Sequence, residues 1–546
     1  MNFNPTNIES YHYIIIGAGS AGCVVANRLS ESPKHRVLLL EAGGSDDNFW
    51  IKVPLGYAKT FMDPSVNWCF STQADPGLNG RLSYWPRGRV IGGSSSINAM
   101  SYFRGLPHDF NDWELAGATG WNWNIVNKTY EQLESNDEID SLGNRKIRGS
   151  GPVWVSDLSD QMHPFSQYFL QGARDLGWPV SYNINSNQNE GLSPIRSTVR
   201  SGRRWSAADA FLKPVKHRQN LRILTSAIVQ KIVLEKMRAT GLIYRQGEKL
   251  VQVHAYEEVI VCAGAINSPH LLQLSGIGPP DLLKRHGITI ENSLNAVGCG
   301  LQDHLALSHY YRAKEPTLNN QLGWFFGKIT AGIHYLLTRC GPLSVPINQI
   351  SGFIRSDNDV SSPDVQVYCN PISYKIQTSG LPKINAEASF LLSAQPCRPS
   401  SRGTIQLASS NPLDAPLIQP NSLSTDEDRD MAIKVGKILQ TLTQAPSIQE
   451  VTQEPLLPDI TVMNDKELLE NFRNRAQTVF HPSCTCRMGR SKKDSVLDSK
   501  LRVHGISSLR VIDASSFPNI TSGNTNAPTL MLASRASDFI LEEKSG

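Results

Sequence analysis

The chain of 546 residues is longer than one ordinary hydrophobic core supports, so we expect two domains. Its composition, with 40% hydrophobic and 19% charged residues, is that of a globular protein and excludes a disordered or fibrous chain. A formal net charge of +4, without a dense stripe of lysine and arginine, argues against nucleic acid as a partner.

The N-terminal part predicts a βαβ unit. Residues 13–16 and 36–40 are apolar runs with the character of buried strands, and residues 21–29 between them have a helical pattern. Two strands joined by a helix run parallel, so this unit predicts a Rossmann-like sheet. The sequence GAGSAG at residues 17–22 connects the first strand to the helix.

This glycine-rich connection is typical of dinucleotide binding. Its glycines permit a tight turn, backbone contact with a pyrophosphate and close packing of helix on strand, while the helix N-terminus holds the phosphates. Glu41 ends the second strand, where its carboxylate accepts hydrogen bonds from a ribose diol. The motif predicts a dinucleotide but does not separate FAD from NAD.

A second loop rich in glycine and serine spans residues 88–96, and its small side chains predict close approach of the backbone to a ligand. Residues 258–262 predict another buried strand. We expect the helix after it to begin with Ser268 as N-cap and Pro269 as first helical residue, and to stop at Gly276.

Residues 305–460 change character, with short strand-like runs, many prolines and serines, and no clear alternation of strand and helix. We interpret them as the substrate domain. Residues 509–513 then predict a strand and residues 529–540 a helix, so the nucleotide domain is closed by the C-terminal part.

Residues 324–337 are aromatic and apolar, interrupted by Lys328 and His334. No run of about eighteen apolar residues exists, which argues against a transmembrane helix. A buried or lid helix is one interpretation, and peripheral association with the inner membrane is the other. The nine cysteines lack the spacing of a disulfide scaffold and no secretory signal is visible, so we otherwise expect a cytoplasmic protein.

Four further segments carry a resemblance to a known family. They are GRVIGGSSSIN at residues 88–98, residues 264–278, HPSCTCRMG at residues 481–489 and GNTNAP at residues 523–528. With the order of the motifs and the chain length, they resemble the glucose-methanol-choline oxidoreductases, most closely the bacterial alcohol dehydrogenases and choline-dehydrogenase-like members. The resemblance implies bound FAD and oxidation of an alcohol.

The fold implied by this resemblance is α/β (α+β overall). A Rossmann-like FAD-binding domain is discontinuous, and a second, substrate-binding domain is built on an antiparallel sheet flanked by helices. We assign residues 1–155, 195–305 and 465–546 to the FAD-binding domain. Residues 156–194 and 306–464 form the substrate-binding domain.

Oxidation of an alcohol by hydride transfer needs a base, because the hydroxyl proton must leave as well. Histidine suits this task, since its ordinary pKa of about 6.5 lies near working pH. The resemblance implies that His481 is this base and that Asn524 orients the alcohol oxygen, with flavin N5 as hydride acceptor. An asparagine there donates and accepts hydrogen bonds without competing for the proton.

The contacts with FAD follow from the glycine motif and from the resemblance. For the ADP half they are Gly17, Gly19, Ser20, Gly22, Glu41 and Ala42. Around the flavin and its linker they are Trp68, Arg89, Gly92, Gly93, Ser94, Asn98, Met100 and Asn524. Asp513 and Ala514 match a second pyrophosphate and ribityl contact, and Val229 is either an adenine contact or a plain sheet residue.

Two departures from the family pattern carry information. Ile97 occupies the place where covalently flavinylated members have histidine, so we expect non-covalent FAD. Choline-oxidising relatives carry a glutamate two residues after the histidine of an Asp-His pair, whereas here Ala306 follows His304 at that spacing. Without this counter-charge, we expect a neutral primary alcohol as substrate, with choline as the second choice.

Cys484 is a third departure, because the family usually has glycine there. A metal site formed with Cys486 lacks further ligands, and a disulfide across one residue is strained, so we expect packed thiols and no metal. A glycine at this place implies a special backbone conformation, which leaves the loop geometry around Cys484 open.

Several functional alternatives remain open from the sequence. We expect a quinone or another carrier to reoxidise the flavin, whereas an alcohol oxidase using oxygen shares the same reductive chemistry. A flavin-dependent lyase or photodecarboxylase and a flavoprotein without catalytic activity are further alternatives. The pair of His481 and Asn524 favours alcohol oxidation. The sequence does not predict the oligomeric state.

Overall fold

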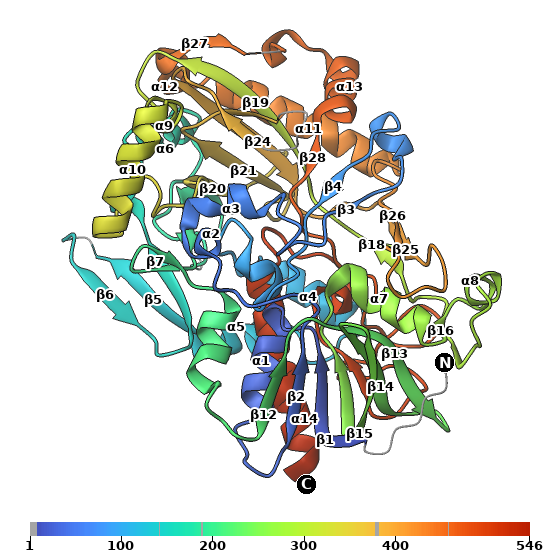
Figure 1. Ribbon diagram of the computed structural model, residues 1–546. Coiled ribbons are helices and arrows are strands. Elements are labelled where there is room, and N and C mark those ends of the chain that lie inside the picture. The colour runs from blue at the N-terminus through green and yellow to red at the C-terminus, as the bar shows by residue number, and fades with distance from the viewer. Residues whose placement is uncertain (1–7, 141, 187–188, 377–381, 457, 546) are drawn as a thin grey trace.

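A seven-stranded sheet carries the glycine-rich motif of the N-terminal part (Figure 1). The computed structural model describes residues 8–140, 142–186, 189–376, 382–456 and 458–545. The parallel strands of this sheet are β12 (Leu221–Leu224), β2 (Val37–Leu40), β1 (Glu9–Ile16), β15 (Lys249–Val261) and β29 (Leu509–Val511). β14 (Arg238–Gln246) and β13 (Ala227–Glu235) extend it antiparallel from β15.

Two helices from opposite ends of the sequence lie side by side against this sheet. α1 (Ser20–Leu29) packs along α14 (Asn526–Ser545), as Figure 1 shows at the bottom of the molecule. The hydroxyl of Ser20 donates to Asn526 Oδ1 at 2.7 Å where the two helices begin. The predicted βαβ unit and C-terminal helix are therefore confirmed, and the C-terminal part completes the Rossmann-like layer.

The helix after β15 begins five residues earlier than its sequence predicts. α7 (Gly264–Leu274) has Ala263 as N-cap, and Pro269 lies inside it, so the prediction of a start at Ser268 and Pro269 is wrong. Proline removes the hydrogen bond to the carbonyl four residues before, here that of Ala265. The hydroxyl of Thr485 donates to this carbonyl at 2.6 Å and replaces the lost bond. The predicted stop at Gly276 is confirmed, since this residue has a φ of +81° directly after the helix.

A second seven-stranded sheet is antiparallel throughout, as predicted for the substrate domain. Its strands are β27 (Thr452–Pro455), β19 (Leu305–Ala313), β24 (Ser389–Pro396), β21 (Val365–Asn370), β20 (Ile350–Ile354) and β8 (Gly191–Pro194), with β28 (Gln477–Thr478) beside β19. The helices whose apolar side chains share its core are α6 (Ser166–Asp175), α11 (Asp426–Thr443), α12 (Pro446–Val451) and α13 (Asp465–Arg475).

Smaller elements surround the two large sheets. The short strands are β3 (Phe70–Ser71), β4 (Tyr84–Trp85), β5 (Glu134–Ile139), β6 (Arg145–Arg148), β7 (Val153–Asp157), β9 (Arg196–Ser197), β10 (Val199–Arg200), β11 (Arg203–Arg204), β16 (Ile277–Gly278), β17 (Asn292–Ser293), β18 (Cys299–Leu301), β22 (Tyr374–Ile376), β23 (Pro382–Ile384), β25 (Gly403–Gln406) and β26 (Leu417–Gln419). The remaining helices include α2 (Phe49–Lys52), α3 (Tyr57–Thr60), α4 (Pro107–Leu115), α5 (Trp123–Leu133), α8 (Pro280–Arg285), α9 (Leu318–Leu322) and α10 (Phe325–Thr338).

α10 contains most of the aromatic and apolar stretch at residues 324–337 and lies at the periphery of the molecule (Figure 1). Only Ala331 and Tyr335 of this helix are buried, which contradicts a buried helix, while a lid helix and peripheral membrane association stay predictions. Among the described residues, no helix combines the length and the apolar character that crossing a membrane requires.

Candidate active site

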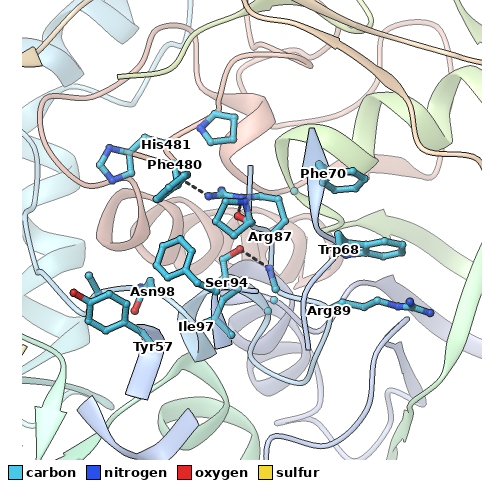
Figure 2. Close-up of a pocket in the computed structure, with 18 of the residues that line it drawn as sticks. Tyr57, Trp68, Phe70, Arg87, Arg89, Ser94, Ile97, Asn98, Phe480 and His481 are labelled. Carbon is cyan, nitrogen blue, oxygen red and sulfur yellow. Dashed lines mark hydrogen bonds between the residues drawn. The ribbon is translucent and has the colours of Figure 1, made fainter. Parts of the chain in front are cut away.

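A cavity of about 1440 Å³ is lined by residues of both large sheets. Its nucleotide end is formed by the glycine motif after β1, and its histidine end by His481, Asn524 and Tyr368. Figure 2 shows side chains that line it, including His481 and Trp68. The volume exceeds the range of about 300–1,000 Å³ typical of small-ligand pockets, which leaves room for a dinucleotide and a small substrate together.

Glycine is required at two places of the nucleotide end. Gly17 has a φ of +98°, and a Cβ there would lie 2.5 Å from the carbonyl oxygen of Cys262. A Cβ on Gly22 would lie 1.9 Å from the carbonyl oxygen of Gly17, so this glycine lets α1 pack closely on the turn. Gly17 and Gly19 line the cavity, which leaves their backbone available to a ligand.

Glu41 follows β2 and faces the same end of the cavity. Its carboxylate accepts the backbone N–H of Ala18 at 2.9 Å and that of Gly43 at 2.8 Å. Burial raises the pKa of Glu41 to about 7, against the opposing effect of these two hydrogen bonds. Ala42 and Val229 line the cavity beside it.

Asp513 connects the late strand β29 to the start of α7. Its carboxylate accepts the backbone N–H of Gly264 at 2.9 Å and the hydroxyl of Ser268 at 2.5 Å. It also accepts the backbone N–H of Ser515 at 2.8 Å. Burial raises the pKa of Asp513 above its ordinary value. Asp513 and Ala514 both line the cavity.

The middle of the cavity is lined by Trp68, Arg89, Gly93, Ser94, Asn98 and Met100. The guanidinium of Arg89 stacks on Trp68, 4.9 Å from the ring centroid (Figure 2). Within the described residues, the buried Nε of Arg89 has no hydrogen-bond partner. A buried donor left unpaired beside a cavity fits a ligand rich in oxygen, such as the pyrophosphate or ribityl chain of FAD.

Gly22 and Gly92, by contrast, do not line the cavity. Gly92 has a φ of +87°, and its backbone N–H donates to the carbonyl of Ala18 at 2.7 Å. Both glycines shape the loops that border the cavity, and a contact of either with FAD stays a prediction.

Strand pairing brings the two histidine-bearing segments together at the other end. β28 pairs antiparallel with the start of β19, and Gln302 pairs with Ser483 on the far side of the two loops. The carboxylate of Asp303 accepts the backbone N–H of His481 at 2.7 Å and also the hydroxyl of Thr478. Burial raises the pKa of Asp303 to about 6.

Arg87 holds the residue before His481. It donates to the carbonyl of Phe480, a residue with a φ of +68°, as the dashed line in Figure 2 shows. A non-glycine residue in this left-handed conformation is uncommon and is held in place here by the surrounding contacts. The imidazole of His481 is therefore presented from a constrained loop.

A chain of four hydrogen bonds fixes the proton on His481. Nε2 of His304 lies 2.7 Å from the carbonyl of Cys397, which only accepts, so His304 carries its proton there. Nδ1 of His304 lies 3.0 Å from Nδ1 of His481 and accepts from it. Nε2 of His481 keeps a lone pair, which accepts from Nδ2 of Asn524 at 2.9 Å. Tyr368 donates to Oδ1 of Asn524 at 3.2 Å and orients this amide.

Both histidines are neutral near pH 7. Burial lowers the pKa of His481 well below its ordinary value, and the nearby His304 and Arg87 lower it further. Burial lowers the pKa of His304 to about 4. A buried neutral imidazole whose Nε2 lone pair accepts only from an amide is able to take a proton from a hydroxyl group that replaces this contact.

Among the described residues that line the cavity, none near this base carries a carboxylate. Among the described lining residues, the carboxylates are those of Glu41, Asp414 and Asp513. The first and third belong to the nucleotide end, and Asp414 lies near His270 of α7. Ala306 lines the cavity close to the histidine pair, at the start of β19. Tyr57 and Tyr374 also line it, and the charged lining residue Arg87, which acts on His481, is a cation.

Family models of the GMC oxidoreductases match residues 11–306 with their N-terminal part and residues 399–533 with their C-terminal part. The chain belongs to the GMC oxidoreductase family. This confirms the resemblance read from the four motifs.

Curated relatives of this GMC oxidoreductase match over nearly its full length. An oxygen-dependent choline dehydrogenase of Vibrio vulnificus is 39% identical, covering 98% of this chain and 95% of the relative. An alcohol dehydrogenase [acceptor] of Pseudomonas putida is 40% identical, and the match covers 98% of this chain and 96% of the relative. Among solved structures, pyridoxine 4-oxidase from Mesorbium loti is 30% identical with a TM-score of 0.86, covering 98% of this chain and 99% of that one.

Formate oxidase of 25% identity superposes on this GMC oxidoreductase with a TM-score of 0.91, covering 99% of both chains. The α/β fold with a Rossmann-like layer and a second antiparallel sheet is thereby confirmed.

Cys484 of this GMC oxidoreductase has the backbone conformation of a glycine, with a φ of +72°. Its backbone N–H donates to the carbonyl of Ala514 at 3.0 Å, and its buried thiol contacts Gln302. Burial raises the pKa of Cys484 to about 12. Cys484 and Cys486 are both free and buried, which agrees with the expectation of packed thiols.

Several residues of the histidine end had no role assigned from the sequence. In the sequence, Asp303 and His304 were informative only because the glutamate expected two residues after the histidine is replaced by another residue. Arg87 directly precedes the glycine- and serine-rich loop, and its sequence position indicated no role. Tyr368 lies in β21, 113 residues before His481, and nothing in its surroundings marks it. The Asp-His pair was the one available signal, because both residues precede a strand that pairs with the segment before His481.

Proposed function

We propose that this GMC oxidoreductase oxidises a neutral primary alcohol to the aldehyde with bound FAD, and that His481 is the base. The hydrogen-bond chain that leaves Nε2 of neutral His481 beside Nδ2 of Asn524 carries this proposal. FAD is supported by the family, by the glycine motif and by the unpaired donor of Arg89 in the same cavity. When bound, FAD supplies a two-electron acceptor that takes hydride from the carbinol carbon at N5.

The chain's own residues handle the proton. The substrate hydroxyl replaces the contact between His481 and Asn524, donating to Nε2 and accepting from the amide Nδ2. As hydride leaves the carbon, the O–H bond breaks and its proton stays on His481, so the alcohol loses one hydride and one proton. Nδ1 of His304 accepts from the imidazolium that results, which stabilises its charge.

The lack of a carboxylate among the described lining residues of the histidine end supports a neutral substrate. Ala306 lines the cavity where choline-oxidising relatives are expected to carry glutamate, and the lining carboxylates belong to other parts of the described cavity. A quaternary ammonium there would lack a counter-charge. Choline is the second candidate, because several relatives are choline dehydrogenases. If the first proposal holds, Ala306→Glu raises choline turnover while lowering that of neutral alcohols.

We also propose that FAD is bound without a covalent bond and that a quinone or another carrier reoxidises it. Ile97 is buried among Ile51, Val66 and Val90, and it offers no nucleophile to the flavin. The relative from Pseudomonas putida carries the word acceptor in its name, which supports a carrier, whereas the relative from Vibrio vulnificus is called oxygen-dependent, which makes oxygen the alternative. Release of all flavin by acid denaturation tests the first point, and comparison of reoxidation by a soluble quinone and by air tests the second.

An anaerobic experiment in the dark tests the central proposal. The holoenzyme is mixed with aliphatic, benzylic and glycol alcohols or with choline, and loss of the oxidised flavin absorbance is followed. We expect fast reduction by neutral primary alcohols and a decrease of about 10³-fold in His481→Ala, as for removal of a general base. The exposed His217→Ala serves as the matched control and keeps the wild-type rate.

Equal rates in the wild type and His481→Ala with every alcohol contradict the proposal. Reduction only by choline selects the second candidate. A flavin that no alcohol reduces in the dark, but that turns over a carboxylic acid under light, selects a photodecarboxylase.

A further inference from the structure

The solvent side of α10 exposes six large apolar residues on one part of its circumference, and the exposed Lys328, Thr330, His334 and Thr338 lie outside that part. Phe325, Phe326, Ile329, Ile333, Leu336 and Leu337 form this surface, which we call the outer face, and they are between 43% and 80% exposed. At about 100° per residue, these six positions fall within about 120° of the helix circumference. They therefore form one continuous stripe rather than scattered exposures.

This stripe has the opposite orientation to that of an ordinary surface helix. Such a helix turns its apolar side toward the core, whereas α10 buries only Ala331 and Tyr335. The hydroxyl of Tyr335 donates to the carbonyl of Gly202 at 2.9 Å, which fixes the orientation of the helix. Large exposed apolar patches of this kind mark interaction surfaces.

The segment that contains the outer face has charged residues of one sign. Residues 316–356 contain no aspartate or glutamate; Lys328 is exposed on α10, and Arg339, directly after the helix, lies over the ring of Tyr335. The exposed Arg203 belongs to the β10–β11 hairpin, whose Gly202 contacts α10. An apolar stripe with aromatic residues and basic neighbours is typical of helices that lie in the interface of a membrane with anionic lipids.

The length of α10 and its position beside the cavity agree with a membrane as the partner. A helix of 14 residues is about 21 Å long, too short to span a bilayer but sufficient to lie in its surface. Lys328 and Gly332, on the flank of α10, line the cavity that contains His481. A membrane that covers the outer face would thus lie beside one wall of the cavity.

A second copy of the chain fits this surface less well. One exposed face of a 14-residue helix offers less than the roughly 800 Å² per partner that a stable dimer buries. A two-fold axis through α10 would also bring Lys328, Arg339 and Arg203 close to their own copies, and like charges oppose such a contact.

We propose that the outer face of α10 inserts into the interfacial region of a membrane that contains anionic lipids. The inference does not depend on which alcohol the enzyme oxidises. Insertion replaces water around six apolar side chains by acyl chains, while the basic residues face the lipid headgroups.

Co-sedimentation of the holoenzyme with vesicles tests this proposal. The vesicles contain phosphatidylcholine alone or a mixture with phosphatidylglycerol. We expect binding to the mixed vesicles that decreases with added salt, and a loss of about tenfold or more in the double variant Phe326→Glu, Ile333→Glu. The matched control, Leu115→Glu with Val462→Glu, changes two exposed apolar residues elsewhere and binds as the wild type.

Flavin reduction by a soluble alcohol stays unchanged in both double variants, because none of the four residues lines the cavity. Arg203→Gln is expected to weaken binding to the mixed vesicles several-fold. The proposal is overturned if the wild type ignores the mixed vesicles, or if the α10 variant binds them as well as the control does. It is equally overturned if the α10 substitutions abolish a dimer in solution without changing vesicle binding.

Discussion

The two ends of the cavity are made of different parts of the chain. At the nucleotide end the main chain forms the surface, with glycines where a Cβ would meet backbone atoms. At the histidine end the surface consists of side chains whose hydrogen bonds pass from Cys397 through His304 and His481 to Asn524. A substitution at the nucleotide end that clashes with backbone atoms must change the local fold. A substitution in the side-chain network can interrupt proton transfer and leave the shape of the cavity unchanged. Changes at the first end should therefore affect FAD binding, and changes at the second should affect chemistry alone.

The largest expected effect is that of Gly22→Ala. Its Cβ would lie 1.9 Å from the carbonyl of Gly17, so α1 must shift away from the turn. We expect loss of bound FAD and a decrease of about 3 kcal/mol in the free energy of unfolding. The flavin-to-protein ratio and denaturant unfolding measure the two effects. Gly44→Ala is the control, since no atom lies within 4 Å of its added Cβ. A full flavin-to-protein ratio in Gly22→Ala would contradict the expectation that changes at the nucleotide end affect FAD binding.

A change of His304 should leave FAD in place and slow the chemistry. His304→Leu removes the acceptor for Nδ1–H of His481, so the proton no longer has a preferred nitrogen. We expect kcat to fall about 100-fold with little change in KM, which is the usual scale for a residue that positions a catalytic group. His304→Gln offers a carbonyl acceptor and an amide donor to Cys397, and it should recover most of the loss. Equal losses in the two variants would mean that His304 only fills space.

The pH dependence of kcat/KM distinguishes the ionisation of Asp303 from that of His481. Burial raises the pKa of Asp303 to about 6, so its carboxylate takes up a proton as the pH falls through that value. His481 stays neutral over the same range, because its pKa is lowered well below its ordinary value. Protonated Asp303 accepts less strongly from the backbone N–H of His481. We expect kcat/KM to decrease several-fold below about pH 6 and to lose this dependence in Asp303→Asn. An unchanged acid limb in the variant would assign it to another group.

The smallest effect concerns Cys484, which lies between the two ends. Its φ of +72° suits glycine, so Cys484→Gly relieves strain while losing one buried sulfur. These contributions oppose each other, and we expect a change within about 1 kcal/mol in the free energy of unfolding. Cys484→Val places a β-branched residue in the same conformation and should destabilise by about 2 kcal/mol. Similar unfolding curves for the two variants would show that the backbone here adapts freely.

The nucleotide end is also the end that the sequence predicts best. Its turn, helix and second strand lie within about forty consecutive residues, so glycine spacing and apolar periodicity describe it directly. The α7 start was mispredicted because the bond that Pro269 removes is replaced by Thr485, from a distant part of the chain. Local rules describe a helix start but do not include a hydroxyl brought in by the fold.

At the histidine end, family resemblance pointed to His481 and Asn524, while the network between them came from tertiary structure. His304 reaches His481 through the pairing of β19 with β28, and Tyr368 reaches Asn524 from β21. Such contacts join residues that are 43 to 177 positions apart. For α10, the sequence left a buried or lid helix and peripheral membrane association as alternatives, because it contained no information on which side of the helix would face the core.

The packing of α14 on α1 has a consequence for biosynthesis. Residues 509–511 add the last strand to the Rossmann-like layer, and Asn526 contacts Ser20 at the phosphate-binding turn. A ribosome makes these segments long after the glycine motif, so the nascent protein cannot enclose FAD before residues 509–526 have been added. Flavin uptake must then follow their synthesis, and a product that stops short of residue 509 should emerge as an apoprotein whose exposed turn is open to proteolysis.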